Sequence, residues 1–335
     1  MATPTRSVSD PSRVVSWTDE IMVLPNKYGT ISQLGLFTEE GVGNNTVQFE
    51  VTTVGSGVLT AVPRGARGQV NANRASLIKS WAIPHFNLTD EIHPSDIHDR
   101  RAFGSPDMED SLNAARTRKL VDMKAKLQRT QDLARATLLN SGVVYGTSLN
   151  MFTEFGVTQN SVDFVLGTGT TDVIGKCSSV VAYAEDNATG SFFSGLVGLA
   201  SPEFFAALVG HAKVTAAYAY YKDGDQQPLR NRLGLIGAQQ VFHFGGIDWV
   251  EVRGSIDGTN RIIAAKHAVV VPTGSDIFKT YFGVADRFDA IGGTGQAMYA
   301  FERMSEDQAS YILQAETNPL NACVKPQLIQ DVFFA

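Results

Sequence analysis

The chain has 335 residues, of which 43% are hydrophobic and 19% are charged, so it can bury a sizeable core and is not a disordered protein. Its formal net charge of −6 argues against a protein that binds phosphate backbones over its whole surface, although a local basic patch is not excluded. No apolar run reaches the roughly 18–20 residues that span a bilayer, and the polar N-terminus lacks a signal-like stretch, so we expect a soluble protein made in a cytoplasm.

Residues 1–45 are predicted to be loosely structured, because prolines interrupt them and Gly41–Val42–Gly43–Asn44 closes them. The runs Ile21–Leu24 and Ile31–Phe37 nevertheless carry too many apolar side chains for a free tail. We therefore expect this segment to lie on a surface, either of its own chain or of a neighbouring one.

Residues 46–88 are predicted to be extended. Thr46–Val54 alternates apolar and polar side chains, as a half-buried strand does, and Leu77–Phe86 is a second such run. Between them a proline and two glycines favour a turn, and Arg64 and Arg67 require solvent or an acidic partner there. Because an isolated hairpin is only marginally stable in water, we expect this one to find support outside its own domain.

Residues 106–140 carry the strongest helix pattern. Ser105 can cap the helix and Pro106 suits its first position, while the acidic residues that follow complement the positive end of the helix dipole. Asn140–Ser141–Gly142 ends it. One face is marked at helical spacing by Leu120, Met123, Leu127, Ala134 and Leu138. About 35 residues span roughly 50 Å, a length typical of a scaffold rather than of a compact enzyme domain.

Beyond the long helix, the sequence alternates short strand-like and helical runs. We expect strands at Val143–Tyr145, Met151–Phe155, Val162–Leu166, Ile247–Arg253 and Arg261–Ala265, with further strand-like runs in Met298–Ala335. Helices are predicted over Thr171–Asp186 and from Ser201–Pro202 through about Tyr220. Asp257–Gly258 predicts a hairpin between the strands that flank it. The fold class is therefore α+β.

The chain carries only weak candidates for catalytic or nucleotide-binding motifs. The stretch Gly169–Cys177 resembles a phosphate-binding loop, but it is one residue too long between its glycines and has Cys177 where a Ser or Thr should hold magnesium. A loop leading into a helix is the better interpretation. Cys177 and Cys323 are far apart and lack metal-like spacing, so we interpret them as structural thiols.

Two charged clusters have a functional and a simpler interpretation. His85, His93 and His98 lie among acidic residues, but their spacing does not place two ligands on one helical face, so a solvated acidic loop is favoured over a metal site. The long helix carries a basic cluster, in which Asp122 and Asp132 are interleaved as on an exposed face. Its members are Arg116, Arg118, Lys119, Lys124, Lys126 and Arg129. We favour a solvated or inter-subunit surface over contact with nucleic acid or an acidic assembly partner.

The order of several short motifs carries a family resemblance. Gln314–Ala315–Glu316–Thr317–Asn318–Pro319–Leu320 is followed by Lys325–Pro326 and an apolar strand that runs to Ala335. Upstream stand Val62–Pro63–Arg64–Gly65, Ser201–Pro202–Glu203–Phe204, the Asp257–Gly258 hairpin and Val271–Pro272–Thr273–Gly274. In these features the chain resembles the lambda-type major capsid protein family of tailed phages, whose members adopt the Hong Kong 97 capsid fold.

The resemblance implies a division of the chain into the parts of that fold. Residues 1–45 would be an N-terminal arm over a neighbouring subunit, and residues 46–104 an extended loop that reaches across another. Residues 105–170 would form the peripheral domain with its spine helix, residues 171–280 the axial domain, and residues 281–335 a return to the peripheral domain.

The resemblance also implies a structural protein rather than an enzyme, with no cofactor and no metal. Copies of the chain would form hexamers and pentamers of an icosahedral head, with portal, scaffold or decoration proteins as further partners and double-stranded DNA enclosed without sequence-specific binding. The virion, and the host cytoplasm during assembly, would be its locations. The hypothetical inter-subunit contacts are Ile21, Leu24, Leu34, Phe37, Arg64, Arg67, Arg116 and Arg118. A cellular nanocompartment shell with the same fold, or a soluble oligomeric enzyme, remain as alternatives.

Overall fold

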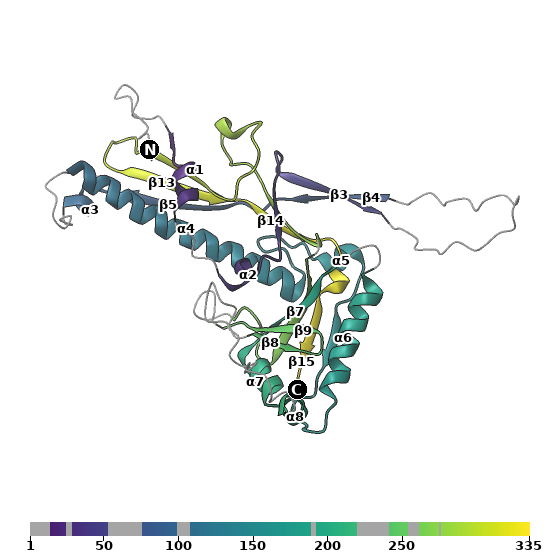
Figure 1. The fold of residues 1–335 in the computed structure, drawn as a ribbon. Helices are drawn as coiled ribbons and strands as arrows, with labels where there is room; N and C mark the ends of the chain where they lie inside the picture. Colours follow the sequence, from purple (N-terminus) through teal and green to yellow (C-terminus); the bar gives the residue numbers. More distant parts are fainter. Residues whose placement is uncertain are drawn as a thin grey trace, which may run out of the picture.

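The computed structural model describes residues 14–24, 29–52, 76–98, 108–188, 192–219, 241–253, 261–274 and 276–335. Figure 1 shows an elongated upper part built along one long helix, a lower part built around a separate sheet, and a two-stranded ribbon that projects from the upper part. Within the described ranges, no helix combines the length and hydrophobicity that a membrane-spanning segment requires. The predicted α+β class is confirmed by helices and sheets in both parts.

The long helix α4 (Met108–Ser141) confirms the strongest sequence prediction, while the predicted cap Ser105 and Pro106 lie outside the described residues. It lies along one face of a four-stranded sheet in the order β1-β12-β13-β5. These strands are β1 (Val15–Ser16), β12 (Tyr299–Met304), β13 (Tyr311–Thr317) and β5 (Phe86–Ile92). Leu120, Met123 and Leu127 on α4 are at most 3% exposed and pack against Leu313 of β13. The helical spacing of these apolar residues therefore places their face on the sheet.

The C-terminal half of α4 packs against a second, three-stranded sheet in the order β14-β11-β2. Its strands are β14 (Pro319–Cys323), β11 (Phe278–Phe282) and β2 (Thr38–Gly41). Leu138 and Leu139 share a core with Phe278 and Leu320. Short helices complete the upper part: α1 (Thr18–Val23), α2 (Thr30–Gln33), α3 (Pro94–His98), α5 (Met151–Phe155) and the 3-10 turn η2 (Phe288–Ala290).

The ribbon consists of β3 (Thr46–Thr52) and β4 (Ser76–Ala82), which pair antiparallel from Thr46↔Ala82 to Thr52↔Ser76. Figure 1 shows it leaving the upper part on the side opposite α3. The two predicted strands of the extended excursion are thereby confirmed. The predicted turn with Arg64 and Arg67 lies outside the described residues.

The lower part is a six-stranded mixed sheet in the order β6-β15-β10-β7-β9-β8, with helices packed on it. The strands are β6 (Asn160–Asp163), β15 (Gln330–Phe333), β10 (His267–Thr273), β7 (Gly195–Ala200), β9 (Ile247–Glu251) and β8 (Val241–Phe244). The helices are α6 (Val173–Asn187), α7 (Pro202–Gly210) and α8 (Ala212–Ala219), and η3 (Pro326–Leu328) precedes β15. Phe164, Phe204 and Trp249 have no exposed surface and form the centre of this core.

The final strand departs from the predicted return of residues 281–335 to the peripheral domain, the part that contains the long helix. β12, β13 and β14 do join the sheets beside α4, but β15 pairs antiparallel with β10 and parallel with β6 in the lower sheet. Val332 on β15 is fully buried there. The last apolar run therefore closes the lower core instead of the upper one.

Three local predictions are wrong for identifiable reasons. Met151–Phe155 is a helix, because the Asn150 side chain accepts hydrogen bonds from the backbone N–H groups of Phe152 and Thr153 and so caps it. The predicted helix from Ser201 is divided at His211, which has extended backbone angles between α7 and α8. Arg261–Ala265 does not pair with β9 as a hairpin would, because β7 and β8 occupy both edges of β9.

Candidate functional site

The described part of the N-terminal segment lies on its own chain. Ile21 has no exposed surface and packs with Leu120, Met123 and Leu127 of α4, and Leu24 is partly buried against the same cluster. Upstream, β1 pairs with β12, so the segment also extends the four-stranded sheet. From the sequence, the supporting surface could belong to the same chain or to a neighbouring one. For these described residues it belongs to the same chain.

Polar side chains of α4 add specific contacts to this packing. The Lys124 ammonium donates to the backbone oxygens of Met22 (3.2 Å) and Leu24 (2.6 Å). About two turns further along α4, the Asp132 carboxylate accepts hydrogen bonds from the Ser32 backbone N–H at 3.0 Å and from its hydroxyl. Lys124 and Asp132 are 2% and 4% exposed, so the interpretation of this face as a solvated one is wrong for both.

The second apolar run of the segment is also covered. Leu34 and Phe37 are partly buried against the core of the second sheet, and the Phe37 ring lies 5.5 Å from that of Phe278. The Arg135 guanidinium lies 5.3 Å from the centre of the Phe37 ring and binds Glu39 at 2.6 Å. Lys124, Asp132 and Arg135 thus all bind the N-terminal segment. The sequence analysis did not identify this shared role, although the spacing of the three residues places them along one side of α4.

These positions correct part of the predicted contact set. Ile21 was expected to depend on a sister copy, which is wrong because its side chain is already fully enclosed. Leu24, Leu34 and Phe37 keep some exposed surface, so their contact with a neighbour stays a prediction.

The buried carboxyl group of Asp132 gives a pH-dependent prediction. Burial raises its pKa above the ordinary 3.8, and the hydrogen bonds from Ser32 and the charge of Arg135 only partly oppose this. The unfolded chain therefore releases this proton at lower pH than the folded chain, and stability is lost as the pH rises from about 3.8 through the folded-state pKa. Asp132→Asn cannot ionise, so its free energy of unfolding relative to the natural chain should increase over that range. Denaturant titrations at several pH values test this, and a constant or opposite difference would contradict it.

Two arginines of the predicted basic cluster have different surroundings. Arg116 is 8% exposed and forms a two-pronged ion pair with Glu302 of β12, at 2.6 Å and 3.0 Å. It therefore stabilises the subunit, and the expectation that it is available to a neighbour is wrong. Arg118 is exposed on the other side of α4, and its inter-subunit role stays a prediction.

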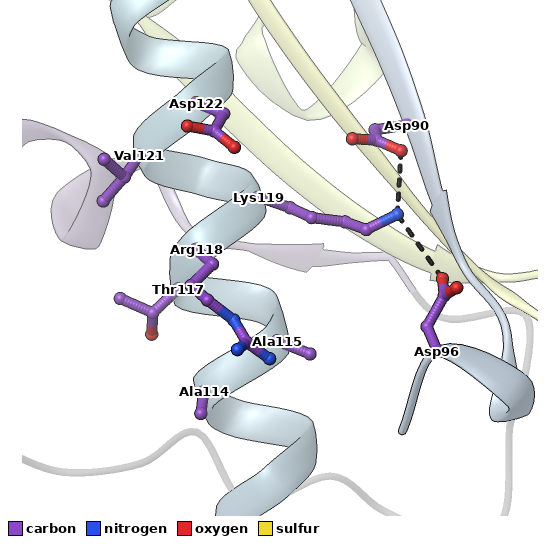
Figure 2. A pocket seen from close by; sticks show the side chains of 9 residues that line it. All are labelled: Asp90, Asp96, Ala114, Ala115, Thr117, Arg118, Lys119, Val121 and Asp122. Atoms are coloured by element: carbon purple, nitrogen blue, oxygen red, sulfur yellow. Dashed lines mark hydrogen bonds and ion pairs between the residues drawn. The ribbon is translucent and has the colours of Figure 1, made fainter. Parts of the chain in front are cut away.

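A cavity of about 860 Å³ lies beside the N-terminal half of α4. Its described lining residues are Asp90, Asp96, Ala114, Ala115, Thr117, Arg118, Lys119, Val121 and Asp122. Figure 2 shows the Lys119 ammonium reaching from α4 toward Asp90 at 3.0 Å and Asp96 at 3.7 Å. No His or Cys is among these lining residues, and no three His, Cys, Asp or Glu side chains anywhere in the described ranges gather as metal ligands would. Two of the carboxylates that line the cavity, those of Asp90 and Asp96, are thus held by the same ammonium group.

The histidines of the predicted acidic loop are separated in space. The His85 ring nitrogen Nδ1 lies 2.8 Å from the Asn318 amide oxygen, where it connects β5 to the end of β13. His93 lies near Glu91, at 3.4 Å, on the surface. The two rings thus have different partners. The predicted loop is wrong, because Asp90 and Glu91 lie on β5 and Asp96 lies on α3, although Glu91 and Asp96 are exposed to solvent.

The ribbon is anchored at its base and exposed beyond it. The Phe49 and Trp81 rings lie 4.3 Å apart, and Trp81 also contacts Phe155 at 6.1 Å. An ion pair of 2.9 Å between Lys79 and Glu154 ties β4 to α5. On the opposite face of β4, Ile78 is 67% exposed. The base is therefore part of the subunit core, while the outer face carries an uncovered apolar side chain.

The two cysteines are buried free thiols, as the interpretation of structural thiols predicted. Cys177 points into the lower core, and burial raises the pKa values of both Cys177 and Cys323 to about 12. At pH 8 only roughly one thiol in ten thousand is then ionised. Iodoacetamide should leave the folded chain unmodified and label both cysteines after denaturation, as intact-mass measurement can determine. Labelling of either thiol in the folded chain would contradict this burial.

Comparison with known proteins places this arrangement in a family. A sequence model of the family described as phage major capsid protein E matches residues 13–333. The chain belongs to this family. It is 32% identical to the major capsid protein of Pseudomonas phage KPP10, with 97% of this chain and 98% of that protein covered, and 25% identical to that of Salmonella phage Felix O1, with 94% of each covered. The resemblance identified from the motif order is thereby confirmed.

Solved structures show the same fold at low sequence identity. The capsid structure of cyanophage P-SCSP1u aligns with a TM-score of 0.56 at 13% identity, covering 93% of this chain and 90% of that one. The mature capsid of bacteriophage PhiM1 aligns with a TM-score of 0.51 at 13% identity, covering 89% and 85%. The fold is therefore the predicted Hong Kong 97-like capsid fold. In that fold, α4 corresponds to the predicted spine helix.

Proposed function

We propose that many copies of this major capsid protein assemble into the closed icosahedral head shell of a tailed phage and enclose its double-stranded DNA. The observation that carries the proposal is the match to phage major capsid proteins over nearly the whole chain. The projecting ribbon supports it, because a two-stranded ribbon gains stability by lying on another surface.

Contacts between copies in such a shell join different surfaces of neighbouring subunits and close into rings. The ribbon, with Arg64 and Arg67 between its strands in the sequence, is one proposed contact, and exposed Arg118 on α4 is another. The lower sheet and its helices, within residues 171–280, would form the axial domain around the hexamer and pentamer axes. The N-terminal segment contributes less than the sequence indicated, since its own α4 covers it.

We further propose that the shell holds its genome without reading the DNA sequence. A net charge of −6 suits a container that does not bind phosphates over its whole surface. Portal, scaffold or decoration proteins would act as partners, and assembly would take place in the host cytoplasm before the protein resides in the virion. The role would be structural, with no catalytic residue and no cofactor required.

Sedimentation velocity of the purified full-length protein over a range of concentrations tests the proposal. We expect subunits or small rings at low concentration and particles of megadalton mass above a threshold, because assembly through many weak contacts depends steeply on concentration. A soluble enzyme would instead give one small, discrete oligomer at every concentration, and that result would contradict the proposal.

A further inference from the structure

An open apolar groove, here called the end groove, lies at the α3 end of the upper part (Figure 1). Its volume is about 230 Å³, and it is bounded by the end of β5, α3, the beginning of α4 and the turn between β12 and β13. Most of its lining is aliphatic or aromatic, so the groove suits one or two apolar side chains. The lining residues are Ile92, Pro94, Ile97, Leu112, Gln308, Ala309, Ser310 and Tyr311.

The rim of the end groove is acidic. Its exposed acids, beside the lining residues, are Glu91 on β5, Asp96 on α3, and Glu306 and Asp307 in the β12–β13 turn. Hydrogen bonds from the Ser305 hydroxyl and the Ala309 backbone N–H lower the pKa of Asp307, so this carboxylate is charged at neutral pH. The rim therefore suits a partner that brings positive charge together with an apolar side chain.

The first described strand directs the N-terminus of the chain toward this groove. β1 pairs antiparallel with β12, with Val15 opposite Glu302. Going back along the chain from Val15 therefore leads along β12 toward Met304, its last residue, and toward the turn that follows it. That turn supplies one wall of the end groove. The chain upstream of Val14 thus begins beside the groove.

Residues 1–13 lie outside the described residues, and their composition complements the groove. They contain two arginines, Arg6 and Arg13, and one acid, Asp10. Val8 stands between the two arginines in the sequence. Thirteen residues can span at most about 45 Å when fully extended, which is more than is needed to cross one tight turn.

We propose that the end groove binds residues 1–13 of its own chain. The Val8 side chain occupies the groove, and Arg6 and Arg13 lie against the acidic rim. Pro11 suits this path, because a proline has no N–H for a further bond to β12 and so ends the pairing before the chain crosses the turn. The inference goes beyond the proposed function, since it concerns the free subunit and closes the groove before copies meet.

The same segment of a second copy is the competing occupant, and the described residues favour the same chain. Val14 packs against Tyr299 and Phe301, and β1 is held on β12, so the segment starts at its own groove. A short tether of this kind gives an effective concentration on the order of millimolar. A second copy in dilute solution is present at a far lower concentration, so its segment is outcompeted.

Photo-crosslinking of the full-length protein, below the concentration at which it assembles, identifies the occupant. Ala309 lines the groove and is exposed, so a benzophenone amino acid at this position reports what covers it. In a mixture of isotopically light and heavy chains, we expect cross-links from position 309 to peptides within residues 1–13, always within one isotope. Mixed-isotope cross-links, cross-links to another segment or no cross-links overturn the proposal. The same amino acid at Ile174, 54% exposed on α6, is the control, and equal capture of residues 1–13 there also overturns it.

Trypsin cleavage after Arg6 provides the second arm of the test, because a docked segment is a poor protease substrate. Val8→Asp places a charge in the apolar groove, so it should release the segment and raise the cleavage rate about tenfold or more. Each rate is divided by that of a synthetic peptide of residues 1–16 with the same substitution, which removes the direct effect of the new side chain on trypsin. Equal normalised rates for the natural chain and Val8→Asp would show that Val8 does not occupy the groove.

Neutralising the rim tests the charge complementarity. Glu306→Gln with Asp307→Asn removes two rim charges and should raise the cleavage rate about threefold. The matched control, Glu185→Gln with Asp186→Asn at the exposed end of α6, should leave the rate unchanged. If the rim variant is cleaved no faster than the control, the arginines do not lie against the rim and the proposal is wrong. None of these measurements requires shell formation, so failure here is distinct from failure of the proposed function.

Discussion

Replacing Arg116 with leucine should lower the free energy of unfolding by about 3–5 kcal/mol. The Arg116 guanidinium binds both carboxylate oxygens of Glu302, whose side chain is 2% exposed. Without the arginine, a carboxylate remains between α4 and β12 with neither water nor a cation to stabilise it. The guanidinium also lies 4.7 Å from the centre of the Trp17 ring, so the substitution removes a contact with the N-terminal segment. Chemical denaturation followed by circular dichroism measures the loss.

A control two positions along the same helix separates this effect from the general cost of losing an arginine. Arg118 is exposed and forms no ion pair within the described residues, so Arg118→Leu should change stability by at most about 0.5 kcal/mol. In the double variant Arg116→Leu and Glu302→Leu, no charge is left buried and most of the stability should return. A loss below about 1 kcal/mol for Arg116→Leu alone would show that the pair is solvated rather than buried.

Deleting Arg64–Gly68 should abolish shell formation while leaving the subunit folded. Strand β3 ends at Thr52 and strand β4 begins at Ser76, so the deleted residues lie outside both strands. The deletion therefore leaves their pairing and the Phe49–Trp81 contact at the base intact. Helix content and thermal midpoint should therefore match those of the natural chain, and only particles seen by sedimentation should disappear. If the deletion variant were less stable than the natural chain but still formed shells, the assignment of this segment to contacts between copies would be contradicted.

The elements predicted well from sequence are those whose pattern is long or strictly periodic. The apolar stripe through Leu120, Met123 and Leu127 repeats over several turns, so it identified α4 without tertiary information. The alternation in Thr46–Thr52 identified β3 in the same way. Met151–Phe155 was too short for its period to distinguish a strand from a helix, and the capping role of Asn150 decided it.

The candidate contact surfaces were less predictable because they depend on which segments meet. Lys124 and Asp132 have the composition of a solvated helix face, and only the fold shows that the N-terminal segment covers them. Arg116 and Arg118 are two residues apart in sequence and lie on different sides of α4, one paired with Glu302 and the other exposed. The destination of β15 likewise depends on long-range pairing with β10, which no local pattern encodes.

We infer that this subunit completes its contacts only as part of a closed shell of identical copies. Electron microscopy of the purified, unmodified protein at assembly concentration tests it most directly. We expect closed, hollow particles of uniform size built from hexameric and pentameric rings. A field of compact single subunits or small oligomers of fixed size, unchanged across concentrations and ionic strengths, would contradict it.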